Sequence, residues 1–132
     1  MGRALVDANV LVGLYRSDDS LHKDAVKLVT KLKGDGFRFV LTNLVLQETA
    51  TVLSMRVGMG LAEKLLKDYK NIIDEEIFIN EGLEMASWKV FLRQKKKGTS
   101  FVDCANLAVV EKYKLDGILT FDKFYPKSLR LV

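Results

Sequence analysis

Four acidic residues stand at positions where a free carboxylate is unusual. Asp7 and Asp122 each follow a short apolar run that is typical of a strand. Asp103 comes at the start of a helical stretch, and Glu48 interrupts an apolar helical stripe formed by Leu44, Val45, Val52 and Met55. A carboxylate on such a stripe is costly unless it is paired, protonated or coordinated. The four positions therefore indicate candidate ligand or catalytic groups.

Most of these acids also have a purely structural explanation when each is taken alone. Ser100 and Asp103 fit the S-x-x-D pattern of a helix capping box. Asp7 could merely end a strand, and Asp122 could merely form an Asx-turn. Glu48 is harder to explain in this way, because acids on apolar stripes are rarely buried without a partner.

Taken together, the four carboxylates favour a metal site. Acids gathered at one edge of a sheet would repel one another strongly unless cations lay between them. The only histidine, His22, is expected to be solvated on a cap-rich helix, and the only cysteine, Cys104, is expected to pack in the core. Oxygen ligands alone select Mg²⁺ or Mn²⁺. Such clusters typically perform phosphoryl or phosphodiester chemistry with a metal-activated water.

Four polar residues near the acids could orient them or position a substrate: Asn9, Thr42, Ser100 and Asn106. Asn106 follows Asp103 by three residues and therefore shares its helical face. Groups beside metal ligands commonly fix the orientation of those ligands through hydrogen bonds. For each of the four residues, a local cap or turn hydrogen bond is the simpler explanation.

The elements that must position these residues alternate between strand and helix. Strands are predicted at residues 4–6, 37–41, 76–80, 118–121 and 129–132. Between them the pattern predicts a short helical turn from residue 9 and helices over about 21–34, 43–56, 61–69, 83–94 and 100–114. This alternation argues for an α/β fold with a mainly parallel, helix-covered sheet. Ligands bind beyond the carboxyl ends of the strands in such sheets, which is where Asp7, Thr42 and Asp122 are expected.

Three of the helices carry more detailed expectations. The helix that begins near residue 21 should take its caps from Asp18, Asp19 and Ser20. The helix after residue 60 should face inward with Ala62, Leu65, Leu66 and Tyr69. The helix over 83–94 should bury some of Met85, Ala86, Trp88, Val90 and Phe91. Met55 and its neighbours up to residue 61 could form an adaptable partner surface, although core packing is the simpler explanation.

Length and composition are those of an ordinary globular chain. With 132 residues, of which 48% are hydrophobic and 29% charged, a single domain over residues 1–132 is expected. No apolar run approaches the roughly 20 residues that span a bilayer, and the first residues lack a signal-peptide pattern. One cysteine allows neither an intrachain disulfide nor a cysteine-based metal cage. A cytoplasmic location is therefore predicted.

The net charge of +4 is modestly basic, and the distribution of charge is more informative than the sum. Basic residues flank the segment that carries two of the acids: Arg93, Lys95, Lys96, Lys97 and Lys123. Basic clusters around acids suggest an anionic substrate, such as an RNA backbone, that is brought to a metal. A solvated surface remains the simpler explanation for any single lysine.

Three motifs resemble those of PIN-domain ribonucleases, in particular the VapC-type toxins of VapBC toxin–antitoxin pairs. They are LVDANVLV, LTNLVLQETATVL and TSFVDCANLAVVEKYKLDGILTFDKFY, and together they cover nearly the whole chain. The resemblance implies a three-layer α/β/α sandwich with a mainly parallel four- or five-stranded sheet. It also implies a Mg²⁺- or Mn²⁺-dependent endoribonuclease in which Asp7, Glu48, Asp103 and Asp122 carry the metal, together with a cognate antitoxin and a homodimer.

Three other functions stay open on the sequence. A Mg²⁺-dependent phosphatase or receiver-like domain also gathers acids at a sheet edge, but an aspartyl-phosphate phosphatase needs Asp-x-Asp, and Asn9 stands at the third position. A binding module of the same fold could hold RNA or a partner protein without cleavage. A stand-alone RNA-processing nuclease would share the acids and lack the antitoxin.

Overall fold

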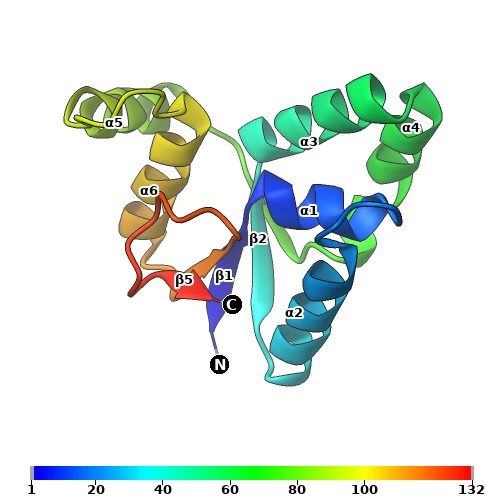
Figure 1. Ribbon diagram of the computed structural model, residues 1–132. Helices are drawn as coiled ribbons and strands as arrows, with labels where there is room; N and C mark the ends of the chain where they lie inside the picture. The colour runs from blue at the N-terminus through cyan, green and yellow to red at the C-terminus, as the bar shows by residue number, and fades with distance from the viewer. Residues whose placement is uncertain (1, 132) are drawn as a thin grey trace.

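The computed structural model describes residues 2–131, which contain one sheet of five parallel strands (Figure 1). The strands lie in the order β3-β2-β1-β4-β5 and are β1 (Arg3–Val6), β2 (Arg38–Thr42), β3 (Glu75–Ile77), β4 (Gly117–Leu119) and β5 (Arg130–Leu131). The order of the strands reverses at β1, which lies at the centre of the sheet. A crevice at the carboxyl end of such a switch point is the usual ligand site of parallel α/β sheets.

Helices cover both faces of the sheet (Figure 1). One core contains residues from α1 (Ala8–Tyr15), α2 (His22–Gly34), α3 (Asn43–Arg56), α4 (Met59–Asp68) and the short 3-10 helix η1 (Tyr69–Asn71). A second core contains residues from α5 (Glu81–Leu92) and α6 (Phe101–Tyr113). Strand β1 contributes side chains to both cores, with Ala4 and Val6 in the first core and Leu5 in the second. The predicted α/β/α architecture is confirmed. Within residues 2–131, every helix is too short or too polar to cross a bilayer.

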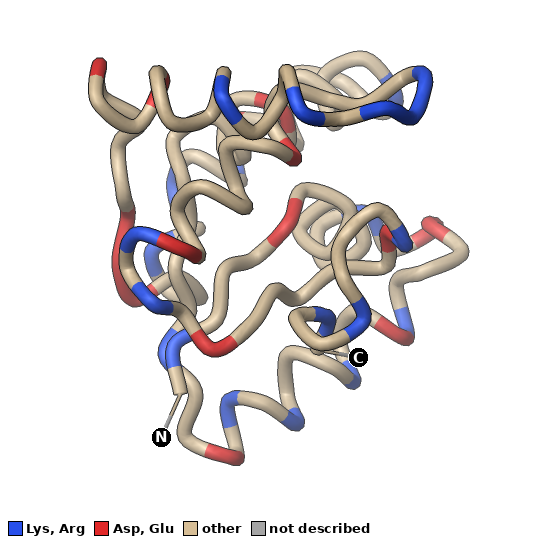
Figure 2. The backbone as a smooth tube through the Cα atoms, turned by 90° about the vertical axis from the view of Figure 1, so that its left-hand side faces the viewer, with Lys and Arg blue, Asp and Glu red and all other residues tan. Residues whose placement is uncertain are grey.

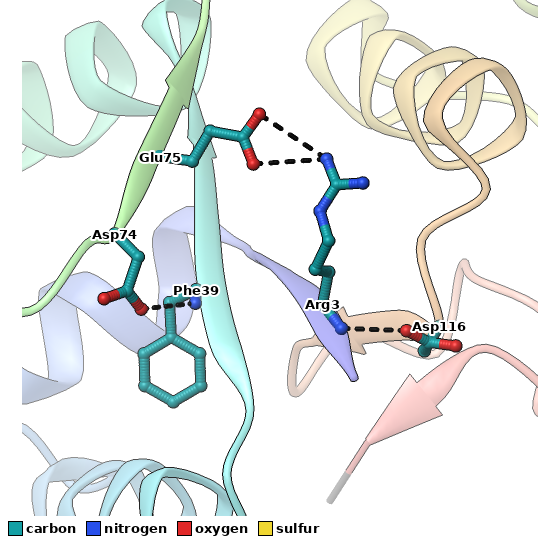
Figure 3. Close-up of polar contacts among 5 residues, drawn as sticks. All are labelled: Arg3, Phe39, Asp74, Glu75 and Asp116. Atoms are coloured by element: carbon teal, nitrogen blue, oxygen red, sulfur yellow. Dashed lines mark hydrogen bonds and ion pairs between the residues drawn. The ribbon is translucent and has the colours of Figure 1, made fainter. Parts of the chain in front are cut away.

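Side chains tie the amino edge of the sheet together (Figure 3). The Arg3 amide donates to Asp116 Oδ2 at 2.8 Å, and the Arg3 guanidinium donates to Glu75 Oε1 at 3.1 Å. The Phe39 amide donates to Asp74 Oδ2 at 2.8 Å. These contacts join β1, β2, β3 and the turn before β4 at the edge opposite the predicted site.

Strand positions predicted from the sequence agree with the observed ones to within a few residues. The largest difference is at β3, which is Glu75–Ile77 rather than residues 76–80. There Phe78 is 64% exposed, and Asn80 caps α5 by accepting from the Leu83 amide at 3.0 Å. The predicted turn from residue 9 is a full helix, α1. The predicted last strand corresponds to β5, and its final residue, Val132, lies outside the described residues.

The apolar stripe predicted for α3 is wrong in part. Val45 is buried, but Met55 is 80% exposed, while the polar residue Thr49 is fully buried. Thr49 Oγ1 donates to the Val45 carbonyl oxygen at 2.7 Å, so its hydroxyl is satisfied within the helix and tolerates burial. The buried face of α3 therefore runs through Thr49 and Leu53, and Glu48 lies at the border of that face.

Helix α5 repeats this exchange of polar and apolar side chains. Ser87 is fully buried and donates to a carbonyl one turn earlier at 2.7 Å. Of the predicted core candidates, Val90 is buried, whereas Met85 and Trp88 are largely exposed. The inward orientation predicted for Leu66 in α4 is also wrong, since this side chain is 51% exposed. Most of the exposed large apolar side chains lie on α3, α4 and α5 or next to them.

Candidate active site

All four predicted acids line one cavity at the carboxyl edge of the sheet. Asp7 directly follows β1, Glu48 lies in the second turn of α3, and Asp103 lies in the first turn of α6. Asp122 follows β4 by three residues. The cavity has a volume of about 450 Å³ and is lined by Asp7, Ala8, Asn9, Val12, Asp19, Leu21, Glu48, Val52, Arg56, Gly98, Ser100, Asp103 and Asp122.

Asp7 is the most buried of the four acids, with 3% of its surface exposed. It caps α1, because its Oδ1 accepts from the Ala8 amide at 2.9 Å. Its Oδ2 accepts from the Thr120 hydroxyl at 2.8 Å. The pKa of Asp7 is raised to about 6, chiefly by burial and also by the charges of Asp103 and Glu48, although the two hydrogen bonds act in the opposite direction.

Thr120 joins Asp7 to the segment that follows β4. Besides donating to Asp7, Thr120 Oγ1 accepts from the Asp122 amide at 3.0 Å and from Asn9 Nδ2 at 3.4 Å. Asn9 Oδ1 in turn accepts from the Phe121 amide at 3.2 Å. The first turn of α1 therefore fixes the backbone that carries Asp122.

Tyr125 links Asp103 to Asn106 within α6. Its hydroxyl donates to Asp103 Oδ1 at 2.9 Å and accepts from Asn106 Nδ2 at 3.0 Å. Asn106 Nδ2 also lies 3.5 Å from Asp7 Oδ1. Tyr125 and Asn106 are almost fully buried, so this network has little freedom to rearrange. Burial and the charge of Asp122 raise the pKa of Asp103, and the Tyr125 hydrogen bond partly offsets the rise.

Glu48 and Asp122 are half-buried in the same cavity. Burial, and then the charge of Asp103, raises the pKa of Glu48. Asp122 Oδ1 accepts from the Phe124 amide at 2.9 Å, which is the Asx-turn that the sequence allowed. The pKa shifts of Asp7, Glu48 and Asp103 share a cause beyond burial, which is the negative charge of another acid in the cavity.

The carboxylate oxygens of the four acids suit a hard divalent cation, although these side chains are not close enough together to enclose one. Among the described residues, no three carboxylate, histidine or cysteine side chains are grouped closely enough to hold a metal ion. The same four acids nevertheless line one cavity, and Glu48 and Asp122 are only half-buried in it. Asn106 Oδ1 is a buried oxygen without a hydrogen-bond partner in the described part of the chain. Mutually repelling oxygen donors of this kind fit Mg²⁺ or Mn²⁺.

A comparison with known protein families identifies the family of this chain. The chain matches the family model of the PIN domain over residues 4–127. It belongs to the PIN-domain family. The resemblance seen in the three sequence motifs is therefore confirmed, whereas the roles of the four acids stay a prediction.

Solved structures share this PIN-domain fold. One is the VapC20 toxin of Mycobacterium tuberculosis, described as cleaving the sarcin-ricin loop, with 24% sequence identity, a TM-score of 0.81, and coverage of 92% of this chain and 91% of that chain. Another is VapBC2 from Rickettsia felis bound to a promoter DNA fragment, with 13% identity, a TM-score of 0.67, and coverage of 97% and 96%. At these identities the likeness concerns the fold. A comparison with curated protein sequences gave no match.

The predicted positioning residues divide into two pairs in this PIN domain. Asn9 and Ser100 line the cavity, and Ser100 also caps α6 by accepting from the Val102 amide at 3.1 Å. Thr42 and Asn106 do not line it. Thr42 Oγ1 caps α3 by accepting from the Val45 amide at 3.1 Å, whereas Asn106 contacts Asp7 and Tyr125 from inside the core.

Cys104 and His22, the only cysteine and the only histidine of the chain, differ in how well their predicted environments agree with the structure. Cys104 is buried in the core, as predicted. His22 is half-buried rather than solvated, and its Nδ1 lies 2.7 Å from the Gly13 carbonyl oxygen. The expectation of a solvated histidine is wrong because the ring packs back against the last turns of α1. Neither residue lines the cavity.

The basic residues predicted to contact RNA do not line the cavity. Arg93 and the run Lys95, Lys96 and Lys97 are exposed between the end of α5 and the start of α6, and Lys123 is exposed next to Asp122. In Figure 2 acidic positions mark the start of α5, while basic positions mark its end and the following loop. Their contact with RNA stays a prediction.

Four residues of this site were not predicted from the sequence as site residues. Thr120 and Tyr125 hydrogen-bond to the acids, and Asp19 and Arg56 line the cavity. Thr120 has a weak signal, because it directly follows β4 as Asp7 follows β1. Tyr125 has none, since nothing in its spacing points to α6.

Asp19 was assigned to a helix cap, and that assignment is wrong. Helix α2 begins at His22 without a side-chain cap. Asp19 Oδ1 instead accepts from the Leu21 amide at 2.8 Å and holds the turn between α1 and α2. The caps expected from Asp18 and Ser20 are likewise not found for α2.

Proposed function

We propose that this PIN domain is a divalent-metal-dependent endoribonuclease and the toxin of a VapC-type toxin–antitoxin pair. The observation that carries the proposal is the convergence of Asp7, Glu48, Asp103 and Asp122 on one cavity. Membership of the PIN-domain family and the shared fold of VapC20, a toxin described as cleaving the sarcin-ricin loop, support the same assignment.

The four acids would hold one or two Mg²⁺ or Mn²⁺ ions, and Glu48 would rotate inward to do so. A bound ion would lower the pKa of a water molecule and stabilise the leaving oxygen of the cleaved phosphodiester. Because Asp7 is buried and Asp122 is fixed by its turn, Glu48 has the greatest freedom to adjust. The raised pKa values of the acids fall when a cation replaces mutual repulsion with attraction.

The neighbouring residues would orient these acids. The Thr120 hydroxyl and the Ala8 amide occupy one oxygen each of Asp7, and Tyr125 occupies one oxygen of Asp103. Each carboxylate therefore has a defined rotation and retains acceptor capacity for a ligand. Hydrogen bonds of this kind typically contribute 10–100-fold to metal affinity or activity.

We further propose two protein partners for the toxin, a cognate antitoxin and a second copy of the chain. The antitoxin is suggested by VapBC2, in which a related fold occurs in a complex of that name. Four apolar side chains on α3 and α4 and the turn between them are exposed, so core packing does not explain them: Met55, Val57, Met59 and Leu66. A cytoplasmic location accords with an RNA substrate.

The ribonuclease proposal is tested with labelled RNA pools, Mg²⁺ or Mn²⁺, and two variants of matched chemistry. Asp7→Asn removes one charge in the cavity, and Asp35→Asn removes one from an exposed position after α2. We expect metal-dependent cleavage by the wild type and by Asp35→Asn, and a loss of at least about 100-fold in Asp7→Asn. Cleavage that persists in EDTA, or equally in Asp7→Asn, would overturn the proposal.

The same assay separates the remaining alternatives. A module that only binds RNA would retain RNA in EDTA and cleave nothing, and its affinity would be unchanged by replacement of the acids. A stand-alone processing nuclease would cleave RNA but co-purify from its host without a partner protein. Phosphate transfer to Asp7 from a small phosphodonor would instead indicate phosphatase-like chemistry.

A further inference from the structure

The cavity extends beyond the four acids along one side of α3. Glu48, Val52 and Arg56 all line it, at intervals of four residues, so they share one face of the helix. Eight residues of helix span about 12 Å, which separates the backbone at Arg56 from that at Glu48 by two turns. The cavity therefore extends from the four acids near the sheet to the last turn of α3.

Arg56 is the single basic residue among the residues that line the cavity, where five of the lining residues are acids. Within residues 2–131, side-chain ion pairs join Arg3 to Glu75 and Arg16 to Asp18, and Arg56 is in neither of them. The guanidinium is exposed, so it is free to bind a ligand that enters the cavity.

A helix-terminal role does not account for this placement. A cation in the last turn of a helix gains typically 0.3–1 kcal/mol from the helix dipole, whichever side of the helix it occupies. The helix dipole explains why a cation such as Arg56 lies in the last turn. It does not explain on which face of the helix the side chain lies. The face chosen is the one that carries Glu48.

We propose that Arg56 binds a phosphate of the RNA strand that flanks the phosphate being cleaved, and so sets the register of the substrate in the cavity. The inference rests on the proposed ribonuclease function. A guanidinium is suited to this task because its planar donors match phosphate oxygens in pairs. A cation beside the metal site would repel the ions, whereas two helical turns away it can hold the strand without that cost.

The first test compares Arg56→Ala with Arg38→Ala, an exposed arginine on β2 at the opposite edge of the sheet. With a short single-stranded RNA that the wild type cleaves, Arg56→Ala should raise KM about 10-fold and leave kcat within about two-fold, as expected when uniform binding is lost. Arg56→Lys should recover part of the loss in KM. Equal KM values for Arg56→Ala and Arg38→Ala, at equal melting temperatures, would overturn the inference.

The second test locates the phosphate. Single phosphates of the substrate are replaced in turn by neutral methylphosphonates, and KM is measured for the wild type and Arg56→Ala. One flanking replacement should raise KM in the wild type and have no effect in Arg56→Ala, which is the coupling that a direct contact produces. Additive effects at every flanking position would contradict the contact.

A third measurement does not depend on cleavage. Binding of short mixed-sequence RNA is measured in EDTA over a range of salt concentrations, with both variants. Loss of one phosphate contact should reduce the slope of log affinity against log salt by about 0.7 in Arg56→Ala and leave it unchanged in Arg38→Ala. If the wild type cleaves no RNA, the proposed function fails, while equal slopes for the two variants reject Arg56 independently.

Discussion

At the scale of single residues, the site keeps acids in an environment that opposes their charge. Asp7 is nearly enclosed and faces two other acids, yet the Thr120 hydroxyl and the Ala8 amide favour its ionised form. The balance leaves its pKa at about 6, well above the 3.8 of an unperturbed aspartate. The metal-free protein therefore loses stability by ionising Asp7 at neutral pH.

The first prediction concerns this cost. Because the folded-state pKa of Asp7 is raised, the folded chain binds more protons than the unfolded chain between pH 3.8 and about 6, and stability falls as pH rises through that window. The shift corresponds to about 3 kcal/mol. Without divalent ions, Asp7→Asn should thus be more stable than the wild type at pH 7.5, and the gain should largely disappear at pH 4.

Urea unfolding at the two pH values measures this difference. The matched control is Asp35→Asn, whose stability relative to the wild type should be the same at both. A wild-type chain as stable as Asp7→Asn at pH 7.5 would show that Asp7 ionises without a penalty. Any loss of the Thr120 hydrogen bond in the variant reduces the gain by about 1 kcal/mol at both pH values.

At the scale of elements, an irregular segment contributes to the positions of the acids in the cavity, as the helices do. Residues 120–125 follow β4 and have no repeating structure of their own. Side chains fix them, since Thr120 contacts Asp7, Asn9 contacts the Phe121 amide, and Tyr125 contacts Asp103. Asp122 is therefore positioned by α6 and by α1, which lies far from it in the sequence.

The second prediction tests this segment through Tyr125→Phe. The substitution retains the ring in the core and removes the hydroxyl that joins Asp103 to Asn106. We expect a 10–100-fold loss of metal-dependent activity and a loss of about 1–3 kcal/mol in unfolding free energy, because Asn106 is left buried without that partner. Metal titration of activity, together with urea unfolding, measures both effects.

Tyr113→Phe is the control for this variant, since Tyr113 is half-buried at the end of α6 and lies away from the cavity. It should change activity less than about two-fold. If Tyr125→Phe retained full activity and the same metal dependence, the Tyr125 hydroxyl would have no part in orienting Asp103.

The same scale shows how far the sequence alone could lead. Most strand ends, the caps Thr42 and Ser100, and the four acids that line the cavity were predicted, because a polar residue that ends an apolar run or interrupts an apolar stripe is a local signal. The caps predicted for α2 and the end predicted for β3 were wrong. The inward faces of α3 and α5 were predicted less well. Thr49 and Ser87 are buried because their hydroxyls bond within the helix, so hydropathy pointed to Met55 and Met85 instead. Tyr125 could not be predicted, because its role depends on tertiary contacts with α6.

At the scale of the whole molecule, both halves of the chain contribute acids to the cavity. Asp7 and Glu48 come from the first half of the chain, and Asp103 and Asp122 come from the second half. A cation held by all four would therefore cross-link the two halves in the folded state and not in the unfolded one. Binding of this kind stabilises the fold by mass action.

The third prediction follows from this cross-link. Mn²⁺ at about 100 times its Kd should add about 2.7 kcal/mol to the unfolding free energy at pH 7.5. The gain should be smaller at pH 5, because protons compete for Asp7, whose pKa is about 6. Thermal unfolding with and without Mn²⁺ measures it, and Asp7→Asn should lose most of the gain. An equal shift in Asp7→Asn would place the ion elsewhere.

The hydrogen bonds and the ion pair at the amino edge of the sheet bear on which substitutions the fold can tolerate during evolution. Arg3, Glu75, Asp74 and Asp116 hold the strands together at the edge opposite the acids, so the fold and the chemistry depend on different residues. A descendant that exchanged its acids for neutral residues would keep its strand order and gain stability. Loss of the proposed catalysis would then carry no penalty in stability for the fold.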